Sequence, residues 1–135
     1  GSASISNKKG IDDSKRIGLN YSMMKFWNKD IFIYAQKNNY LLIPGIKNLI
    51  ELKKAISLNC NVVKIYPLAE KEKSLNINKY IRKVNFIAAG GLSITDIKYI
   101  KSIGFKGFVI GKHAYNENIF NPEVIQWLEL NNMNI

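Results

Sequence analysis

The chain has 135 residues, of which 47% are hydrophobic and 22% charged, a composition typical of one soluble globular domain spanning residues 1–135. No apolar run reaches the roughly 18–20 residues of a membrane span, no signal peptide opens the chain, and Cys60 is the single cysteine, so we expect a cytoplasmic protein with no membrane partner. The net charge is +10, and its source is lysines scattered along the chain, with arginine only at Arg16 and Arg82. No RNA-binding fingerprint appears in the sequence. We therefore expect an anionic small molecule as the partner, and not a nucleic acid.

Short apolar runs alternate with amphipathic segments along the chain. The first third is compatible with a strand at 2–6, a helix at 8–17, a strand at 19–24 and a helix at 30–37. A strand at 41–43 then ends at Pro44-Gly45, as strands do at turns.

The next helix, at 49–58, has its apolar residues on one face. A buried strand follows at 62–66, and then a short helix at 77–81.

Residues 86–88 form the next predicted strand, which is closed by Gly90-Gly91. Ser93 and Asp96 are spaced as in a capping box, and Gly104 marks the end of the helix that they begin.

A strand at 108–110 comes next, and Asn121-Pro122 opens the last helix with a cap and a proline at the first helical position. Strands alternate with helices and no hairpin signal appears, so we predict six βα units that share one parallel sheet, an α/β fold.

Lys64 lies inside the β-branched and aromatic run Asn61-Val-Val-Lys-Ile-Tyr-Pro67. A buried ammonium is costly, and lysine is tolerated in such a place when its amine must lose a proton easily to attack a carbonyl. The alternative is that Lys64 alternates outward and extends its amine to solvent. The heptapeptide alone leaves both interpretations open.

Function in parallel α/β folds sits at the carboxyl ends of the strands. Gly90-Gly91 ends one predicted strand and Gly111-Lys112 ends the next, so two consecutive loops offer bare backbone amides, the second beside a cation. Tight turns would explain either pair alone, but together they match a phosphate site built by the last two loops of a barrel. His113 has no partner at a metal-ligand spacing, so we expect no metal.

Four segments in this order resemble the 2-keto-3-deoxy-6-phosphogluconate (KDPG) / 4-hydroxy-2-oxoglutarate (KHG) aldolases: Leu42-Ile-Pro-Gly45, Val63-Lys-Ile-Tyr-Pro67, Phe86-Ile-Ala-Ala-Gly-Gly91 and Phe108-Val-Ile-Gly111. The resemblance extends upstream to Gly1-Ser-Ala-Ser-Ile5. It implies a (β/α)8 TIM barrel of which this chain holds the last six βα units.

The resemblance also implies a class I, Schiff-base aldolase that splits a 2-keto acid into pyruvate and an aldehyde, with no cofactor besides its lysine. Lys64 matches the Schiff-base lysine, and Ser4, Pro44 and Tyr66 match substrate-binding positions. Members of this family generally form homotrimers, and we expect the apolar residues Phe26, Trp27 and Phe32 around the fourth unit to contribute to such an interface. The resemblance places the phosphate of the substrate at Gly90, Gly91, Gly111 and Lys112.

Several positions depart from the family pattern. Ala88 and Ala89 replace a proline and a threonine, Lys112 replaces a serine, and Met24-Lys25-Phe26 replaces a Ser-Pro-Gly turn, so the aldehyde half of the substrate is left open. The family's general acid/base glutamate belongs to a strand that precedes this chain. The chain is therefore either part of a longer aldolase or a non-catalytic module that binds anions or partners. Another phosphate-binding barrel enzyme is a third interpretation, and Glu70 is the local alternative for the general base.

Overall fold

The computed structural model describes residues 1–68, 77–117 and 119–131. The N-terminal half contains strands β1 (Ser2–Ile5), β2 (Tyr21–Met24), β3 (Leu41–Ile43), β4 (Gly45–Ile46) and β5 (Val62–Ile65), with helices α1 (Lys8–Arg16), α2 (Lys29–Lys37) and α3 (Leu49–Ser57) between them. The C-terminal half contains β6 (Asn85–Ala89), α5 (Ile97–Ser102), β7 (Gly107–Val109), β8 (Tyr115–Asn116), β9 (Ile119–Phe120) and α6 (Pro122–Leu130). Short 3-10 turns lie at Ile77–Lys79, Ile94–Asp96 and Lys112–Ala114.

All main strands run parallel, which confirms the predicted α/β fold, although they form two parallel sheets instead of the single sheet that the sequence predicted. One sheet has the order β1-β2-β3 and the other β4-β5-β6-β7. Pro44 separates β3 from β4, so one extended stretch of chain, residues 41–46, takes part in both sheets. The Lys64 N–H donates to the Pro44 carbonyl at 2.8 Å and so joins the second sheet to this stretch.

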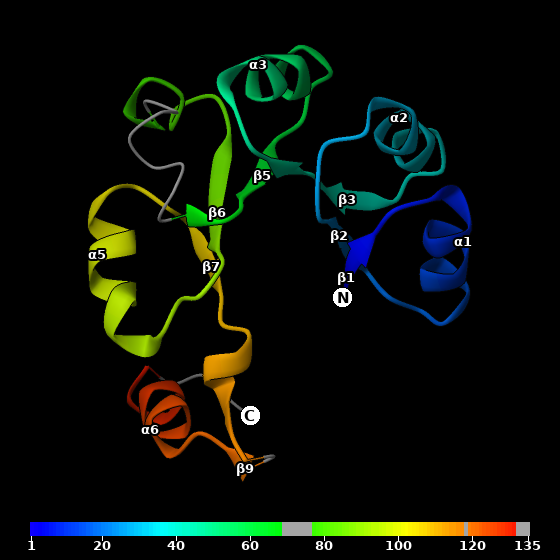
Figure 1. The fold of residues 1–135 in the computed structure, drawn as a ribbon. Helices are drawn as coiled ribbons and strands as arrows, with labels where there is room; N and C mark the ends of the chain where they lie inside the picture. The colour runs from blue at the N-terminus through cyan, green and yellow to red at the C-terminus, as the bar shows by residue number, and fades with distance from the viewer. Residues whose placement is uncertain (69–76, 118, 132–135) are drawn as a thin grey trace.

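The row of strands does not close into a barrel. In the part of the chain that the structure describes, β1 pairs only with β2 and β7 only with β6. Figure 1 shows the strands following an open arc, with α1, α2, α3 and α5 on its outer side. A cavity of about 370 Å³ lies between the two ends of the arc, lined by Gly1, Tyr21 and Met23 on one side and by Phe108 and Ile110 on the other.

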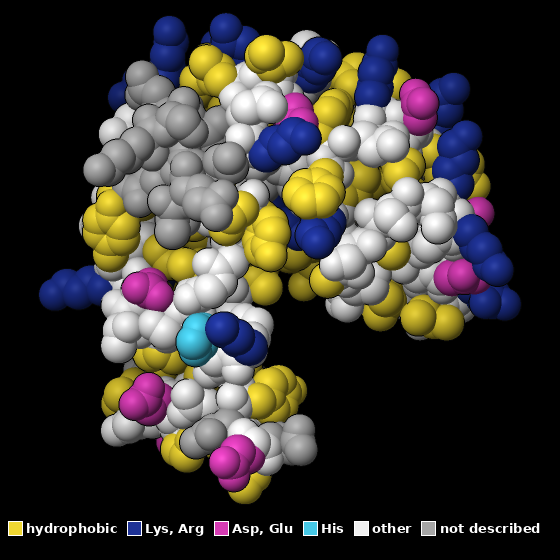
Figure 2. Space-filling model, viewed as in Figure 1, with side chains coloured by type: hydrophobic (Ala, Val, Ile, Leu, Met, Phe, Trp, Pro, Cys, Tyr) yellow, Lys and Arg dark blue, Asp and Glu magenta, His cyan; other side chains and the backbone are white. Residues whose placement is uncertain are grey.

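The hydrophobic core fills the space between the outer face of the strands and the helices. Val63 and Ile65 of β5 and Phe86 of β6 are fully buried there. Leu52 and Ala55 of α3 pack in the same core, on the apolar face that the sequence predicted. No helix among the described residues is long and apolar enough to cross a membrane. Figure 2 shows lysine and arginine side chains at separate places on the face in view, in keeping with their scatter along the sequence.

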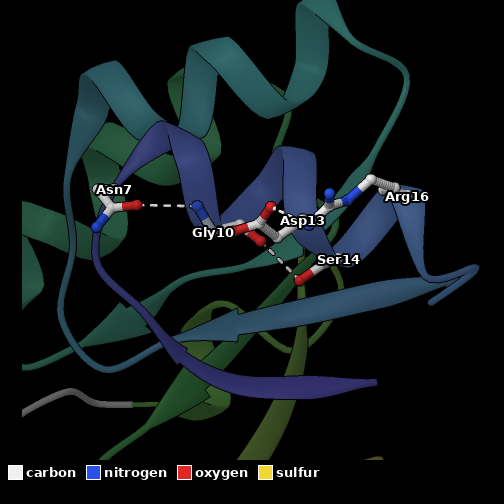
Figure 3. A network of polar contacts seen from close by, with 5 residues as sticks. All are labelled: Asn7, Gly10, Asp13, Ser14 and Arg16. Carbon is white, nitrogen blue, oxygen red and sulfur yellow. Dashed lines mark hydrogen bonds and ion pairs between the residues drawn. The ribbon is translucent and has the colours of Figure 1, made fainter.

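Helix α1 begins with a side-chain cap that Figure 3 shows in detail. The Asn7 Oδ1 accepts from the Gly10 N–H at 2.8 Å, which satisfies one of the free amides of the first turn. Ser14 Oγ donates to the Gly10 carbonyl at 2.7 Å, and Asp13 pairs with Arg16 at 2.9 Å (Figure 3). These contacts fix α1 where the sequence predicted it.

Ser14 also ends a chain of hydroxyl groups that links the first three strands to α1. The Tyr40 hydroxyl lies 2.7 Å from Ser22 Oγ, which lies 2.7 Å from Ser2 Oγ, which lies 3.1 Å from Ser14 Oγ. Ser22 is fully buried and Ser14 is 3% exposed. Because each buried hydroxyl has a partner, the cost of removing it from water is offset.

Cys60 lies just before β5 and is buried. Its thiol donates to the Val62 carbonyl at 3.0 Å. Burial raises the pKa of the Cys60 thiol to about 11, although the hydrogen bond to Val62 acts in the opposite direction. The thiol therefore stays protonated near neutral pH.

Three features of the C-terminal half differ from the sequence-based expectation. The short helix predicted at 77–81 is a 3-10 turn at Ile77–Lys79. The helix after Ser93 starts as a 3-10 turn and becomes α-helical only at Ile97, although the Asp96 carboxylate accepts from the Ser93 N–H at 2.7 Å as predicted. Strands β8 and β9 form a small antiparallel hairpin that the sequence did not reveal. Its strands are two residues long, too short for an alternating pattern to show.

Candidate active site

Lys64 lies on the inner face of the arc. Its neighbours Val63 and Ile65 point into the core, and side chains alternate along a strand, so Lys64 points to the opposite face. The residue is nevertheless only 7% exposed. The interpretation in which Lys64 extends its amine outward to solvent is therefore wrong.

Burial makes the Lys64 amine easier to deprotonate than the amine of an exposed lysine. Burial lowers the pKa of Lys64 below its ordinary 10.5. Its Nζ lies 6.0 Å from the centroid of the Tyr66 ring, and within the described residues no carboxylate forms an ion pair with it. An amine without an anionic partner loses its proton more readily, which a carbonyl-attacking lysine requires.

Gly45 is the register partner of Lys64 on the neighbouring strand. A β-carbon on Gly45 would overlap the Lys25 carbonyl oxygen and would stand 2.7 Å from the Lys25 carbonyl carbon and 2.9 Å from the Met24 carbonyl oxygen. The end of β2 therefore passes directly over Gly45. Pro44 beside it is fully buried, and its carbonyl anchors the backbone of Lys64.

The loop after β6 packs against the end of β5. Gly90 has a φ of +105°, and a β-carbon there would stand 2.9 Å from the Pro67 Cα and 3.2 Å from the Tyr66 ring. Gly91 has a φ of +71° and is exposed, with no atom within 4 Å of a β-carbon built on it. Both backbone conformations favour glycine.

Gly111 and Lys112 follow β7 and are exposed. The register pairs Ala89 at the end of β6 with Val109 at the end of β7, so the two glycine-bearing loops leave adjacent strands in the same direction. The structure thus places the four residues of the predicted phosphate site in neighbouring loops. Phosphate binding by these loops stays a prediction.

Ser4 lies apart from Lys64. Its φ is +64°, which is uncommon for a residue other than glycine, and it falls within a register irregularity between β1 and β2. It lines a cavity of about 260 Å³ together with Lys25 and Trp27, among others, and Lys64 is not part of that lining. Strands β2, β3 and β4 stand between Ser4 and Lys64 in the order of the sheets.

The sequence-based reasoning did not single out Lys25 and Lys47 as site residues. Lys25 directly follows β2, so the same rule of strand ends that led to Lys64 would have found it. His113 is exposed. Among residues 1–68, 77–117 and 119–131, no group of histidine, cysteine and carboxylate side chains gathers as a metal site. Glu70 lies outside the described residues.

No family model matches the sequence, and no curated protein matches it significantly. Several solved structures match its fold. The 2-keto-3-deoxy-6-phosphogluconate aldolase of Zymomonas mobilis ZM4, solved with 3-phosphoglycerate, has a TM-score of 0.76 at 20% identity, and the match covers 95% of this chain and 63% of that one.

The KDPG aldolase of Legionella pneumophila, solved with pyruvate captured as a covalent carbinolamine, has a TM-score of 0.70 at 20% identity and covers 84% of this chain and 59% of that one. A cube-shaped protein cage designed by fusing symmetric oligomeric domains has a TM-score of 0.76 at 16% identity and covers 86% of this chain and 44% of that one. The chain thus spans less than two thirds of these structures. The likeness confirms, at the level of the fold, the resemblance to the KDPG/KHG aldolases.

Proposed function

We propose that this chain carries the reactive lysine of a class I aldolase that cleaves a KDPG or KHG type substrate into pyruvate and an aldehyde. The observation that carries the proposal is Lys64, a buried amine whose pKa is lowered by burial, on the central strand of an aldolase-like fold. The similar aldolase of Legionella pneumophila holds pyruvate as a covalent carbinolamine, which is the adduct that this chemistry would form.

In the proposed mechanism, the neutral Lys64 amine attacks the C2 ketone of a 2-keto acid to give a carbinolamine, which loses water to form a protonated imine. The bond between C3 and C4 then breaks, and its electron pair moves into the imine to give an enamine of pyruvate. The C4 hydroxyl loses its proton as the aldehyde leaves. Protonation of the enamine at C3 and hydrolysis of the imine release pyruvate and restore the amine. These steps use no cofactor, because the Lys64 side chain itself forms the covalent intermediate.

The other residues have supporting roles in this proposal. The Pro44 carbonyl holds the Lys64 backbone through the 2.8 Å hydrogen bond, and the Tyr66 ring covers the amine. Ser4 would contact the pyruvate half. The loops with Gly90, Gly91, Gly111 and Lys112 would hold a phosphate at the other end of the substrate.

We propose further that the arc is completed by two more βα units. Eight strands close a barrel of this kind, and the described residues hold six parallel stretches of strand when β3 and β4 are counted as one. Because no carboxylate is paired with Lys64 in the described part of the chain, we propose that the added units also supply the general acid/base. Such groups contribute about 10²–10⁴ in rate, so the 135 residues alone should form the imine but cleave substrate poorly.

A homotrimer is the proposed assembly, and light scattering would test it. Of the apolar residues expected at its interface, Phe26 is 50% exposed, whereas Phe32 is buried and packs against the partly buried Trp27, with ring centroids 5.4 Å apart and ring planes tilted by 42°. Phe26 is therefore available for contact with another subunit. Phe32 is buried, so the expectation that it lies at the subunit interface is wrong.

Reductive trapping tests the proposed chemistry. Incubation with pyruvate and borohydride should leave one carboxyethyl group on Lys64, read by peptide mass spectrometry. Lys64→Arg should give no adduct, because a guanidinium does not lose its proton near neutral pH. An adduct that persists in Lys64→Ala, or an unmodified Lys64 in the natural sequence, would contradict the proposal.

A further inference from the structure

The Tyr66 ring borders both the Lys64 amine and the first of the two glycine loops. Lys64 Nζ lies 6.0 Å from the centroid of the ring. A β-carbon built on Gly90 would stand 3.2 Å from the ring carbon Cδ2, so the Gly90 backbone packs close to the same ring. Tyr66 directly follows β5 and is half-buried. A molecule that extends from the amine to the Gly90 loop therefore runs along Tyr66.

The Tyr66 hydroxyl has no hydrogen-bond partner among the described residues. Two other tyrosines show the contrast, because the Tyr34 hydroxyl donates to Asp12 Oδ1 at 2.9 Å and the Tyr40 hydroxyl lies 2.7 Å from a serine hydroxyl. Lys64 Nζ, on a residue that is only 7% exposed, likewise forms no hydrogen bond or ion pair with any described group. Neighbouring polar groups that the protein leaves unpaired are arranged to receive a polar ligand.

The side chains around Lys64 on the same face of the second sheet are apolar. Ile87 on β6 is the register partner of Lys64, and Ala89 lies two residues further along that strand, on the same face. Val109 on β7 is the register partner of Ala89. Beside the Lys64 amine, Tyr66 thus supplies the hydroxyl that this group of described residues can offer to a bound molecule.

We propose that the Tyr66 hydroxyl binds the C4 hydroxyl of the 2-keto acid whose ketone reacts with Lys64. In the imine, C2 is bonded to Nζ and C4 is two carbons further on, so the C4 hydroxyl lies a few bonds from the amine, alongside a ring whose centroid is 6.0 Å from it. A phenol can donate to that oxygen or accept from it. The inference rests on the proposed aldolase function and adds a residue that determines which acid is bound.

Such a contact would select the acids that can react. Cleavage of the C3–C4 bond needs an oxygen on C4, because that oxygen becomes the aldehyde oxygen of the leaving fragment. A 2-keto acid without it can form the imine with Lys64 but cannot be cleaved in this way. A hydrogen bond from Tyr66 to the C4 hydroxyl would therefore favour occupation of the amine by a cleavable substrate.

The test compares two acids that differ only at C4. Both 4-hydroxy-2-oxoglutarate and 2-oxoglutarate have two carboxylates and a C2 ketone, and only the first has the C4 hydroxyl. Each is incubated with the protein and borohydride, and mass spectrometry counts all adducts on Lys64, whether or not the C3–C4 bond has broken. In Tyr66→Phe, the concentration of 4-hydroxy-2-oxoglutarate that gives half-maximal trapping should rise about two- to tenfold, the contribution of one neutral hydrogen bond. The concentration of 2-oxoglutarate should not change.

Two controls accompany the comparison. Tyr115→Phe removes a hydroxyl from a residue that is 59% exposed on β8, and it should leave the trapping of both acids unchanged. Urea unfolding of Tyr66→Phe should give the free energy of the natural sequence, because the ring remains and its hydroxyl has no described partner to lose. A clear loss of stability would show that the hydroxyl serves the fold, and this result would count against the proposal.

The outcomes separate this inference from the aldolase proposal. Trapping of 4-hydroxy-2-oxoglutarate that is the same in Tyr66→Phe would overturn the role of Tyr66, and an equal loss for both acids would overturn it as well. Pyruvate ends at C3, so its trapping tests the aldolase proposal independently of the Tyr66 hydroxyl. If pyruvate also fails to modify Lys64 in the natural sequence, the aldolase proposal falls and this inference falls with it.

Discussion

The backbone carbonyl of Lys25 occupies the position where a side chain on Gly45 would begin. Gly45→Ala should therefore force β2 and β4 apart next to Lys64. Overpacking of this kind costs about 1–3 kcal/mol, and urea unfolding would measure it as a lower midpoint.

Gly107 offers a matched control because it lies in the same row of the sheet, which runs Gly45–Lys64–Ile87–Gly107. A β-carbon on Gly107 would meet only the Ile87 side chain, at an ordinary 3.4 Å. Gly107→Ala should change the unfolding free energy far less. Equal losses in the two variants would mean that the Lys25 carbonyl is not the cause.

Replacing Lys64 with methionine should change how stability depends on pH. Because burial lowers the pKa of Lys64 in the folded state, the unfolded chain binds more protons between that lowered pKa and 10.5. The free energy of unfolding contributed by Lys64 therefore rises with pH across this window. Lys64→Met should be more stable than the natural sequence at neutral pH, with a difference that shrinks as the pH approaches 10.5.

The difference between the two proteins is the quantity to measure, by urea unfolding at several pH values. Burial raises the pKa of Cys60, so this thiol makes stability depend on pH with the opposite sign. Both proteins contain Cys60, and its contribution therefore cancels in their difference. Lys53→Met, at an exposed site, should show no such pH-dependent gain. A difference between natural sequence and Lys64→Met that stays constant with pH would contradict the lowered pKa.

The hydroxyl chain predicts a loss of stability at Ser22. Ser22→Ala would leave the Tyr40 hydroxyl without its 2.7 Å partner in a site that is 7% exposed. An unsatisfied buried hydroxyl costs about 1–3 kcal/mol, which thermal unfolding would detect. Ser57→Ala, on an exposed serine, is the control.

A double variant tests whether the loss comes from the unpaired group. Ser22→Ala combined with Tyr40→Phe removes both partners, so it should cost less than the sum of the two single changes. Additive losses would indicate that the two hydroxyls do not depend on each other.

Much of the fold could be predicted because it depends on local chemistry. The strand around Lys64 follows from its β-branched neighbours, and the capping side chains Asn7 and Asn28 follow from helix-start preferences. The break at Pro44 could not be predicted from the local pattern, because a proline at a strand end and a proline between two sheets look alike in sequence. The hydroxyl chain through Ser22 was also hidden, since its members are far apart in the sequence.

The candidate site could also be predicted only in part. Lys64 could be found because a charge in an apolar strand is conspicuous by itself. Lys25 could not be linked to it, because the contact passes through Gly45, and only the folded chain shows that the end of β2 crosses that glycine. The open arc was expected from the resemblance, because six of the eight strands of a barrel leave a parallel sheet with two free edges.

Lys112→Gln tests the anion site at the two glycine loops. Lys112 is the cation beside the Gly111 amide, so its loss should weaken phosphate binding and reduce the dependence of that binding on salt concentration. NMR titration with inorganic phosphate would measure both effects. Lys106→Gln, an exposed lysine just before β7, should leave them unchanged. Phosphate binding that is the same in Lys112→Gln would remove Lys112 from the site.

The buried thiol of Cys60 makes the chain its own reporter of local opening. With a pKa of about 11, only about one thiol in a thousand is ionised at pH 8, and that one is shielded from reagents. Labelling by an alkylating reagent must therefore await the opening of the segment just before β5. Its rate, followed by mass spectrometry, would report the opening equilibrium beside the strand that carries Lys64, or the opening rate where labelling outpaces reclosing, without any engineered probe.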